Sequence, residues 1–159
     1  MQSAGFVRPE RNIVLSRILD APRELVFKLW TDPAHLAMWW GPKNFTNPVC
    51  EVDARPGGAL GIVMRAKDGA EHPMKGVFRE VIPPGKLVFT NIAVDCAGNV
   101  LLEGLTSVTF EDIGGKTKLT VETGAVGMVE MAAGMLQGMD AGWGQSLDKL
   151  ANLTCRFAA

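Results

Sequence analysis

The sequence predicts an α+β protein with a seven-stranded antiparallel sheet, two short helices after the first strand and a long C-terminal helix. Two observations carry this prediction. Short runs of alternating apolar and polar residues, separated by turn signals, fill the chain from residue 45 to residue 123. After residue 127, apolar residues recur at helical spacing instead. The length of 159 residues fits one domain, 1–159, of which we expect residues 1–11 to be flexible.

The N-terminal part predicts one strand and two helices. Residues 14–20 alternate as in a strand. Pro22 and Pro33 each follow a possible capping residue, and proline suits the first position of a helix. We therefore expect helices at 22–30 and 33–38, the second of which is ended by Gly41-Pro42.

The middle of the chain predicts six strands joined by short turns, which is the pattern of an antiparallel meander. Pro56-Gly57 and Asp68-Gly69 are typical turn signals between such strands. The expected strands cover residues 50–55, 60–65, 75–82, 87–94, 100–110 and 116–123.

The C-terminal part predicts one helix of about 30 residues, which would be about 45 Å long. Its apolar stripe runs from Met128 to Phe157, and the apolar stretch 124–139 is assigned to the same helix. Four glycines interrupt it, each at a cost of up to about 1 kcal/mol of helix propensity. They indicate close approach to another surface, or a bend; they are Gly134, Gly138, Gly142 and Gly144.

Composition and charge exclude several classes of protein. The 17 acidic and 16 basic residues leave no basic excess for nucleic-acid binding. No apolar run approaches the roughly 18 residues of a membrane span. Cys50, Cys96 and Cys155 form no CxxC pair, so we expect no structural metal and a cytoplasmic protein. We expect each of the three cysteines to be a small apolar residue in the core.

No constellation of catalytic side chains stands out, and we predict no catalytic residue, metal or cofactor. His35 and His72 belong to different elements and are expected to be solvated. Glu80 shares strand parity with Phe78, so it is a buried acid with a raised pKa if that face is interior. The alternative is a surface glutamate paired with a basic neighbour.

Several short motifs occur in a fixed order along residues 13–153. They are Ala21-Pro22-Arg23-Glu24-Leu25-Val26-Phe27, Trp30-Thr31-Asp32-Pro33, Trp39-Trp40-Gly41-Pro42, Val52-Asp53-Ala54-Arg55-Pro56-Gly57-Gly58, Gly76-Val77-Phe78-Arg79-Glu80-Val81, Pro83-Pro84, Leu87-Val88-Phe89-Thr90, Val108-Thr109-Phe110-Glu111-Asp112, Lys116-Thr117-Lys118-Leu119-Thr120, Gly138-Met139, Gly142-Trp143, and Leu147 with Leu150. Together they resemble the START-like (SRPBCC, helix-grip) superfamily, in the branch of homologues of the heat-shock-protein-90 ATPase activator.

The resemblance implies a curved sheet wrapped round the C-terminal helix, with an apolar cavity between them. It favours binding of a small apolar or amphipathic molecule over catalysis. A chaperone-cofactor-like module that binds a protein partner or forms a homodimer is the alternative, and a cyclase or dehydratase that uses Glu80 is a further one. Strand parity and helical spacing predict that the cavity is lined by Ile62, Met64, Phe78, Phe89, Leu102, Met135, Met139 and Trp143. The predicted ligand-binding residues also include Trp40, Phe45 and Glu80.

Overall fold

The structure, a computed structural model, describes residues 7–158, which form seven strands and four helices. Their order along the chain is β1(Glu10–Leu19), α1(Arg23–Thr31), α2(Pro33–Trp39), β2(Thr46–Val52), β3(Ala59–Arg65), β4(Glu71–Ile82), β5(Lys86–Val94), β6(Val100–Ile113), β7(Lys116–Gly127), α3(Ala132–Gln137) and α4(Met139–Ala158).

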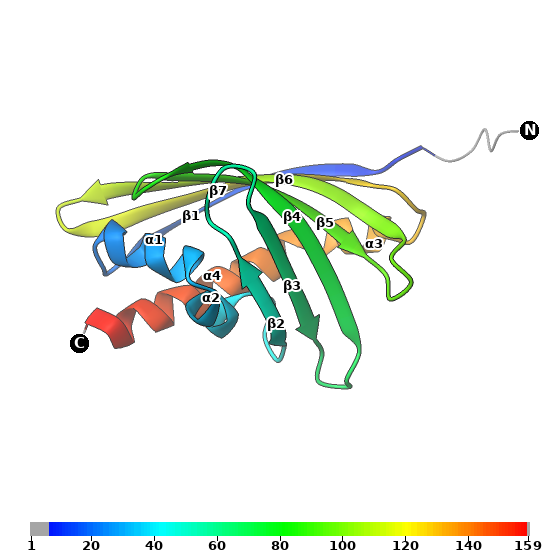
Figure 1. Ribbon diagram of the computed structural model, residues 1–159, viewed down its shortest axis with the longest axis horizontal. Helices are drawn as coiled ribbons and strands as arrows, with labels where there is room; N and C mark the ends of the chain where they lie inside the picture. Colours follow the sequence, from blue (N-terminus) through cyan, green and yellow to red (C-terminus); the bar gives the residue numbers. More distant parts are fainter. Residues whose placement is uncertain (1–6, 159) are drawn as a thin grey trace, which may run out of the picture.

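All seven strands form one antiparallel sheet, which confirms the predicted α+β helix-grip fold. The strand order is β1-β7-β6-β5-β4-β3-β2, so the first strand pairs with the last and the other strands are neighbours in chain order. The sheet curves over α4, and α1 and α2 lie on the same side of the sheet as α4 (Figure 1). The concave face of the sheet is therefore the one that the helices cover.

Several strands differ from their predicted bounds: β2 lies at Thr46–Val52 instead of 50–55, β6 continues to Ile113, and three other strands are four residues longer at one end. β1 begins at Glu10, β4 begins at Glu71, and β7 continues to Gly127. Each extension is paired: Glu10 lies opposite Val126 of β7, and Glu71 lies opposite Arg65 of β3. Backbone hydrogen bonds to a neighbouring strand extend these strands. The local alternation of apolar and polar residues does not reveal such bonds. Residues 1–6 of the segment expected to be flexible lie outside the described residues.

The predicted C-terminal helix is divided into α3 and α4 at Gly138, whose backbone has φ −85° and ψ 0°. The bend that the glycines indicated is therefore present. Residues 124–127 belong to β7 and not to a helix, because they pair with β1 and β6. No helix within residues 7–158 is long and apolar enough to cross a membrane.

The core lies between the concave face and the helices, and Trp30 of α1 is at its centre. The Trp30 ring contacts those of Trp39, Phe89 and Phe110, with centroids 4.6, 6.4 and 6.1 Å apart. Trp39 is fully buried, and its indole N–H donates to the carbonyl of Leu29 at 3.0 Å. Buried aromatic residues of this size contribute much of the stability of a core.

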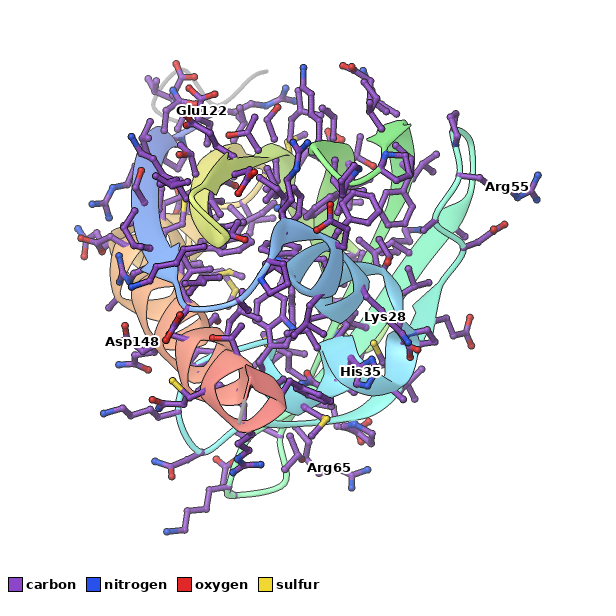
Figure 2. All side chains as sticks on the ribbon, turned by 90° about the vertical axis from the view of Figure 1, so that its left-hand side faces the viewer. Lys28, His35, Arg55, Arg65, Glu122 and Asp148 are labelled. Carbon is purple, nitrogen blue, oxygen red and sulfur yellow. The ribbon has the colours of Figure 1, made fainter. Side chains whose placement is uncertain are left out.

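Charged side chains point away from this core into solvent. Figure 2 shows this for Arg55, Arg65 and Glu122. The expectation that all three cysteines are core residues is wrong for Cys96 and Cys155, which are exposed. Cys96 lies in the β5–β6 turn and Cys155 on the outer side of α4. Cys50 packs against the core, and partial burial raises the pKa of its thiol to about 11.

Candidate ligand-binding cavity

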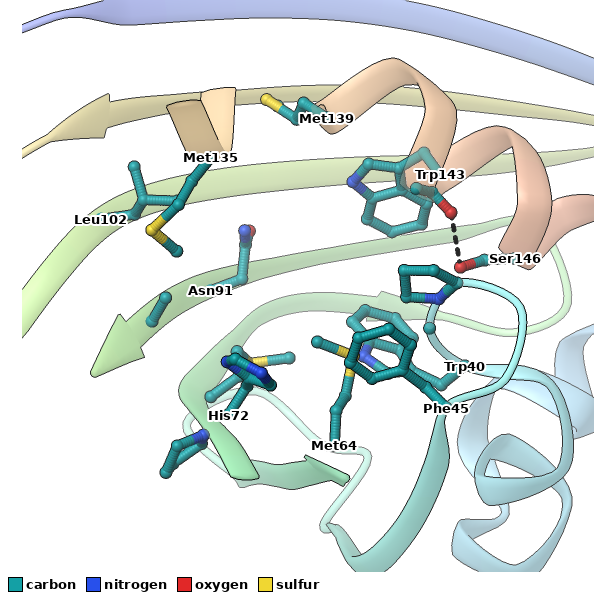
Figure 3. Close-up of a pocket in the computed structure, with 16 residues that line it drawn as sticks. Trp40, Phe45, Met64, His72, Asn91, Leu102, Met135, Met139, Trp143 and Ser146 are labelled. Carbon is teal, nitrogen blue, oxygen red and sulfur yellow. Dashed lines mark hydrogen bonds between the residues drawn. The ribbon is translucent and has the colours of Figure 1, made fainter. Parts of the chain in front are cut away.

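A cavity of about 440 Å³ lies between the concave face of the sheet and the helices α3 and α4 (Figure 3). Strands β3 to β6 supply one side, α3 and α4 the opposite side, and the α2–β2 connection the rim. Its lining residues are Trp40, Gly41, Pro42, Phe45, Met64, His72, Pro73, Met74, Asn91, Ala93, Leu102, Met135, Met139, Gly142, Trp143 and Ser146.

Most of the sequence-predicted site residues meet at this cavity. They come from five different elements or connections, so the fold alone brings them together. Those that line it are Trp40, Phe45, Met64, Leu102, Met135, Met139 and Trp143. Four methionines, Met64, Met74, Met135 and Met139, form much of the apolar wall. Flexible thioether side chains allow such a wall to adapt to ligands of different shape.

Three predicted residues are on the correct face but do not line the cavity. Ile62, Phe78 and Phe89 are only 1–2% exposed and belong to the solid core. The Phe78 and Phe89 rings pack edge to face with centroids 5.9 Å apart. Strand parity identifies the side chains that face inward. It does not tell which of them pack in the solid core and which line the cavity.

Glu80 is on the opposite, outer face, so the hypothesis of a buried acid is wrong. A β-bulge between Phe78 and Glu80 inserts one extra residue and reverses the alternation of β4. The Glu80 side chain is 48% exposed, and its carboxylate lies 3.6 Å from Lys86 Nζ. The alternative of a surface glutamate near a basic neighbour describes it correctly, and the structure gives no support to an enzyme that uses Glu80 in the cavity.

Sequence reasoning missed three polar lining residues, His72, Asn91 and Ser146. His72 and Met74 share parity with Phe78, but the predicted start of β4 at Lys75 left them out of the strand. His72 is exposed at the rim, with its ring centroid 5.9 Å from that of Phe45. For Asn91 a signal was available, because an amide that alternates with Phe89 on an inward face is unusual.

Asn91 is held by hydrogen bonds within the sheet. The Thr106 hydroxyl donates to Asn91 Oδ1 at 2.8 Å, and Thr106 Oγ1 is also 2.8 Å from Thr123 Oγ1. Thr106 and Thr123 are 0% and 3% exposed. Figure 3 shows the Asn91 amide pointing from β5 into the space below Met139. On the opposite wall, the Ser146 hydroxyl donates to the Gly142 carbonyl at 2.9 Å (dashed line in Figure 3).

The connection from Gly41 to Phe45 forms one side of the cavity and is fastened to α4. Two residues in it have positive φ, Gly41 at 94° and Asn44 at 68°. The Lys43 N–H donates to Gln145 Oε1 at 3.0 Å. Lys149 Nζ donates to the Pro42 carbonyl at 3.2 Å, and burial lowers the pKa of this lysine. These two contacts hold the rim against the helix.

No Asp, Glu, Lys or Arg is among the lining residues. Within residues 7–158, no group of three His, Cys, Asp or Glu side chains is placed to hold a metal ion. The arrangement can surround an apolar molecule and orient it through a few neutral hydrogen-bonding groups, as ligand pockets of this size do.

Comparison with known proteins agrees with this architecture. The model of the family described as "Activator of Hsp90 ATPase homolog 1-like protein" matches residues 20–154. A protein from Chromobacterium violaceum is similar in structure, with TM-score 0.78 and 29% identity over 90% of this chain and 96% of that one. No curated protein matches the sequence.

Two further crystal structures are similar over most of their length. A protein from Silicibacter pomeroyi, described as an AHSA1 protein, has TM-score 0.78 and 25% identity, covering 91% of this chain and 98% of that one. A protein from Nitrosomonas europaea has TM-score 0.75 and 25% identity, covering 92% and 96%.

Proposed function

This chain belongs to the family of Activator of Hsp90 ATPase homolog 1-like proteins, and on that premise we propose that it binds a small apolar or amphipathic molecule in the cavity between the sheet and helices α3 and α4. The observation that carries this proposal is the cavity of about 440 Å³ itself. Its volume is within the range of about 300–1,000 Å³ typical of small-molecule sites.

The driving force for binding is removal of apolar surface from water, worth about 25 cal/mol for each Å² buried. Trp40, Met135 and Trp143 offer such surface at the cavity. A tightly packed core has few voids larger than one water molecule. A liquid-filled space of this size would hold about 15 waters at roughly 30 Å³ each, mostly beside apolar walls. Replacing them with an apolar ligand is favourable.

A filled cavity tests the proposal. Ala93 lines the cavity from β5, and Ala93→Phe would place a ring inside it at a strand position that tolerates aromatic residues. Ala97→Phe is the matched control, because Ala97 lies exposed in the turn that follows the same strand. We expect Ala93→Phe to lower the affinity for the neutral dye Nile red at least tenfold, while Ala97→Phe leaves it unchanged. Equal dye binding by both variants would contradict the proposal.

A partner-binding module is the second candidate, favoured by the family description and by exposed apolar residues on an edge strand. Val14 and Ile18 of β1 are 63% and 59% exposed. An apolar edge strand of this kind is a possible contact surface. Sedimentation of the wild type and of Val14→Lys/Ile18→Lys tests it. Self-association that the double substitution removes would support a homodimer. A wild type that sediments as a monomer would contradict the homodimer.

A further inference from the structure

We infer that the cavity selects neutral molecules that carry a hydrogen-bond acceptor, such as a ketone, ester or amide, and that Asn91 is the residue that recognises this acceptor. The inference rests on the proposed function and narrows its ligand class. It excludes ionised fatty acids and similar anions, which the shape of an apolar cavity alone would admit.

The structure places Oδ1 of the Asn91 amide, and not Nδ2, beside the Thr106 hydroxyl. Thr106 has one hydroxyl proton, and it is donated to Asn91 Oδ1. The contact between Thr106 and Thr123 then requires Thr123 to be the donor. This chain of bonds is buried and holds Asn91 Oδ1 beside Thr106 of β6, while Nδ2 lies next to Gly104 of the same strand, 2.7 Å from the position of a Cβ added there. Asn91 Nδ2 is left as a donor at the cavity, and within residues 7–158 no acceptor is bonded to it.

Other groups at the cavity agree with a ligand that accepts hydrogen bonds. The indole N–H groups of Trp40 and Trp143 donate to no acceptor within the described part of the chain, and both rings line the cavity. The Ser146 proton is used within α4. The polar groups of the walls are therefore mainly donors. Once an apolar ligand has displaced the water, a donor that is left without an acceptor costs free energy.

The absence of charge from the lining argues for a neutral acceptor. The described lining holds no arginine or lysine that would pair with a carboxylate, and its one histidine, His72, is exposed at the rim. Lys149 is not among the lining residues, and its Nζ donates to the Pro42 carbonyl. Transfer of an ionised carboxylate from water into an apolar cavity without a cationic partner is strongly unfavourable. A carbonyl group makes the same hydrogen bond to Asn91 without that desolvation penalty.

Three probes with one skeleton test the inference by displacement of Nile red at pH 7. They are 2-acetonaphthone, which carries a neutral acceptor, 2-ethylnaphthalene, which carries none, and 2-naphthoate, which is an anion. Each is titrated against the wild type, Asn91→Leu and Thr106→Val. Asn152→Leu is the control, since it makes the same change at an exposed position of α4. Urea unfolding checks that each variant is folded.

We expect the ketone to bind at least tenfold more tightly than the naphthoate. Asn91→Leu should lower the affinity for the ketone relative to the hydrocarbon by roughly fivefold, the effect of one neutral hydrogen bond. Thr106→Val frees the Asn91 amide to rotate. It should lower the ratio of ketone affinity to hydrocarbon affinity by less than Asn91→Leu does, and it should leave hydrocarbon binding unchanged. This ratio would not respond to a purely structural effect on the cavity.

An unchanged ratio in Asn91→Leu, or tighter binding of the naphthoate than of the ketone, would overturn the inference while the proposed function stands. An unchanged ratio in Thr106→Val alone would overturn the positioning role of Thr106. If neither Nile red nor any of the three probes binds the wild type, the proposed function itself fails, and the inference fails with it.

Discussion

The indole rings of Trp30 and Trp143 are stacked, with centroids 6.3 Å apart and an angle of 17° between their planes. Trp30 is 2% exposed and belongs to the core, whereas Trp143 also lines the cavity. One face of Trp143 thus packs on protein, and another part of its surface is available to a ligand. This pair is the boundary between the solid core and the cavity.

This boundary predicts different effects for two tryptophans. Trp143→Ala should cost less than about 2 kcal/mol of unfolding free energy, because only part of the ring is buried in protein. Trp39→Ala should cost about 3–5 kcal/mol, because Trp39 is completely buried. Urea unfolding measures both. Nile red affinity should fall strongly in the Trp143 variant. A loss of more than 3 kcal/mol with unchanged dye binding would make Trp143 purely structural.

Glycine at position 41 is predicted to be needed for the shape of the cavity wall. A Cβ there would lie 2.9 Å from the sulfur of Met64, at a φ of 94°. Gly69 has a similar φ of 92° but open space around it, so Gly69→Ala is the control. Both substitutions should cost about 1–2 kcal/mol of stability for the left-handed backbone.

Only Gly41→Ala should in addition displace Met64 and weaken Nile red binding, since only this Cβ meets a cavity residue. Dye titration of the two folded variants checks this. Equal dye affinity would show that the contact between residue 41 and Met64 does not shape the site.

Glu80 is predicted to have no role in binding. Its ion pair with Lys86 is on the surface, where such pairs contribute about 0–1 kcal/mol. Glu80→Gln should therefore change the unfolding free energy by no more than about 1 kcal/mol and leave Nile red affinity unchanged. A weaker dye complex would indicate that the outer face of β4 is part of the binding site.

The three thiols are predicted to differ in reactivity. The raised pKa of Cys50, about 11, leaves almost no thiolate at pH 8, whereas Cys96 and Cys155 are exposed. At pH 8 in the native state, a disulfide reagent such as DTNB should react quickly with two thiols and slowly with the third. Fast modification of Cys50, shown by mass spectrometry of peptides, would contradict its placement against the core.

The raised pKa of the Cys50 thiol also makes the stability of the protein depend on pH. A thiol that holds its proton more tightly when folded stabilises the protein fully below the unfolded pKa of about 9, and this contribution is lost as pH rises through about 11. Wild-type stability should therefore decrease more steeply over this interval than that of Cys50→Ala. Identical pH profiles would show that Cys50 ionises equally in both states.

The topology was predictable from the sequence because turn signals and alternation are local. Asp68-Gly69 and Pro56-Gly57 mark turns that the structure contains. Strand ends were less predictable, since pairing with a distant neighbour, as between Glu10 and Val126, extends β1 and β7.

Part of the site was predictable because strand parity and helical spacing are also local features of the sequence. Parity placed Met64 and Leu102 on the inward face, and helical spacing placed Met135 and Trp143 opposite them. The bulge that turns Glu80 outward is one inserted residue, and no turn residue marks it in the sequence. The orientation of Asn91 depends on Thr106 of the next strand, so only the three-dimensional structure reveals it.

Methyl NMR of methionine tests the central claim of a ligand cavity most directly. The chain has eight methionines, and Met64, Met74, Met135 and Met139 line the cavity, whereas Met38 and Met131 are exposed outside it. With ¹³C-methyl methionine, titration with 2-acetonaphthone should shift the four cavity signals, assigned by Met→Leu variants, and leave those of Met38 and Met131 in place. Shifts confined to Met38 or Met131, or no shift at all, would contradict binding between the sheet and helices α3 and α4.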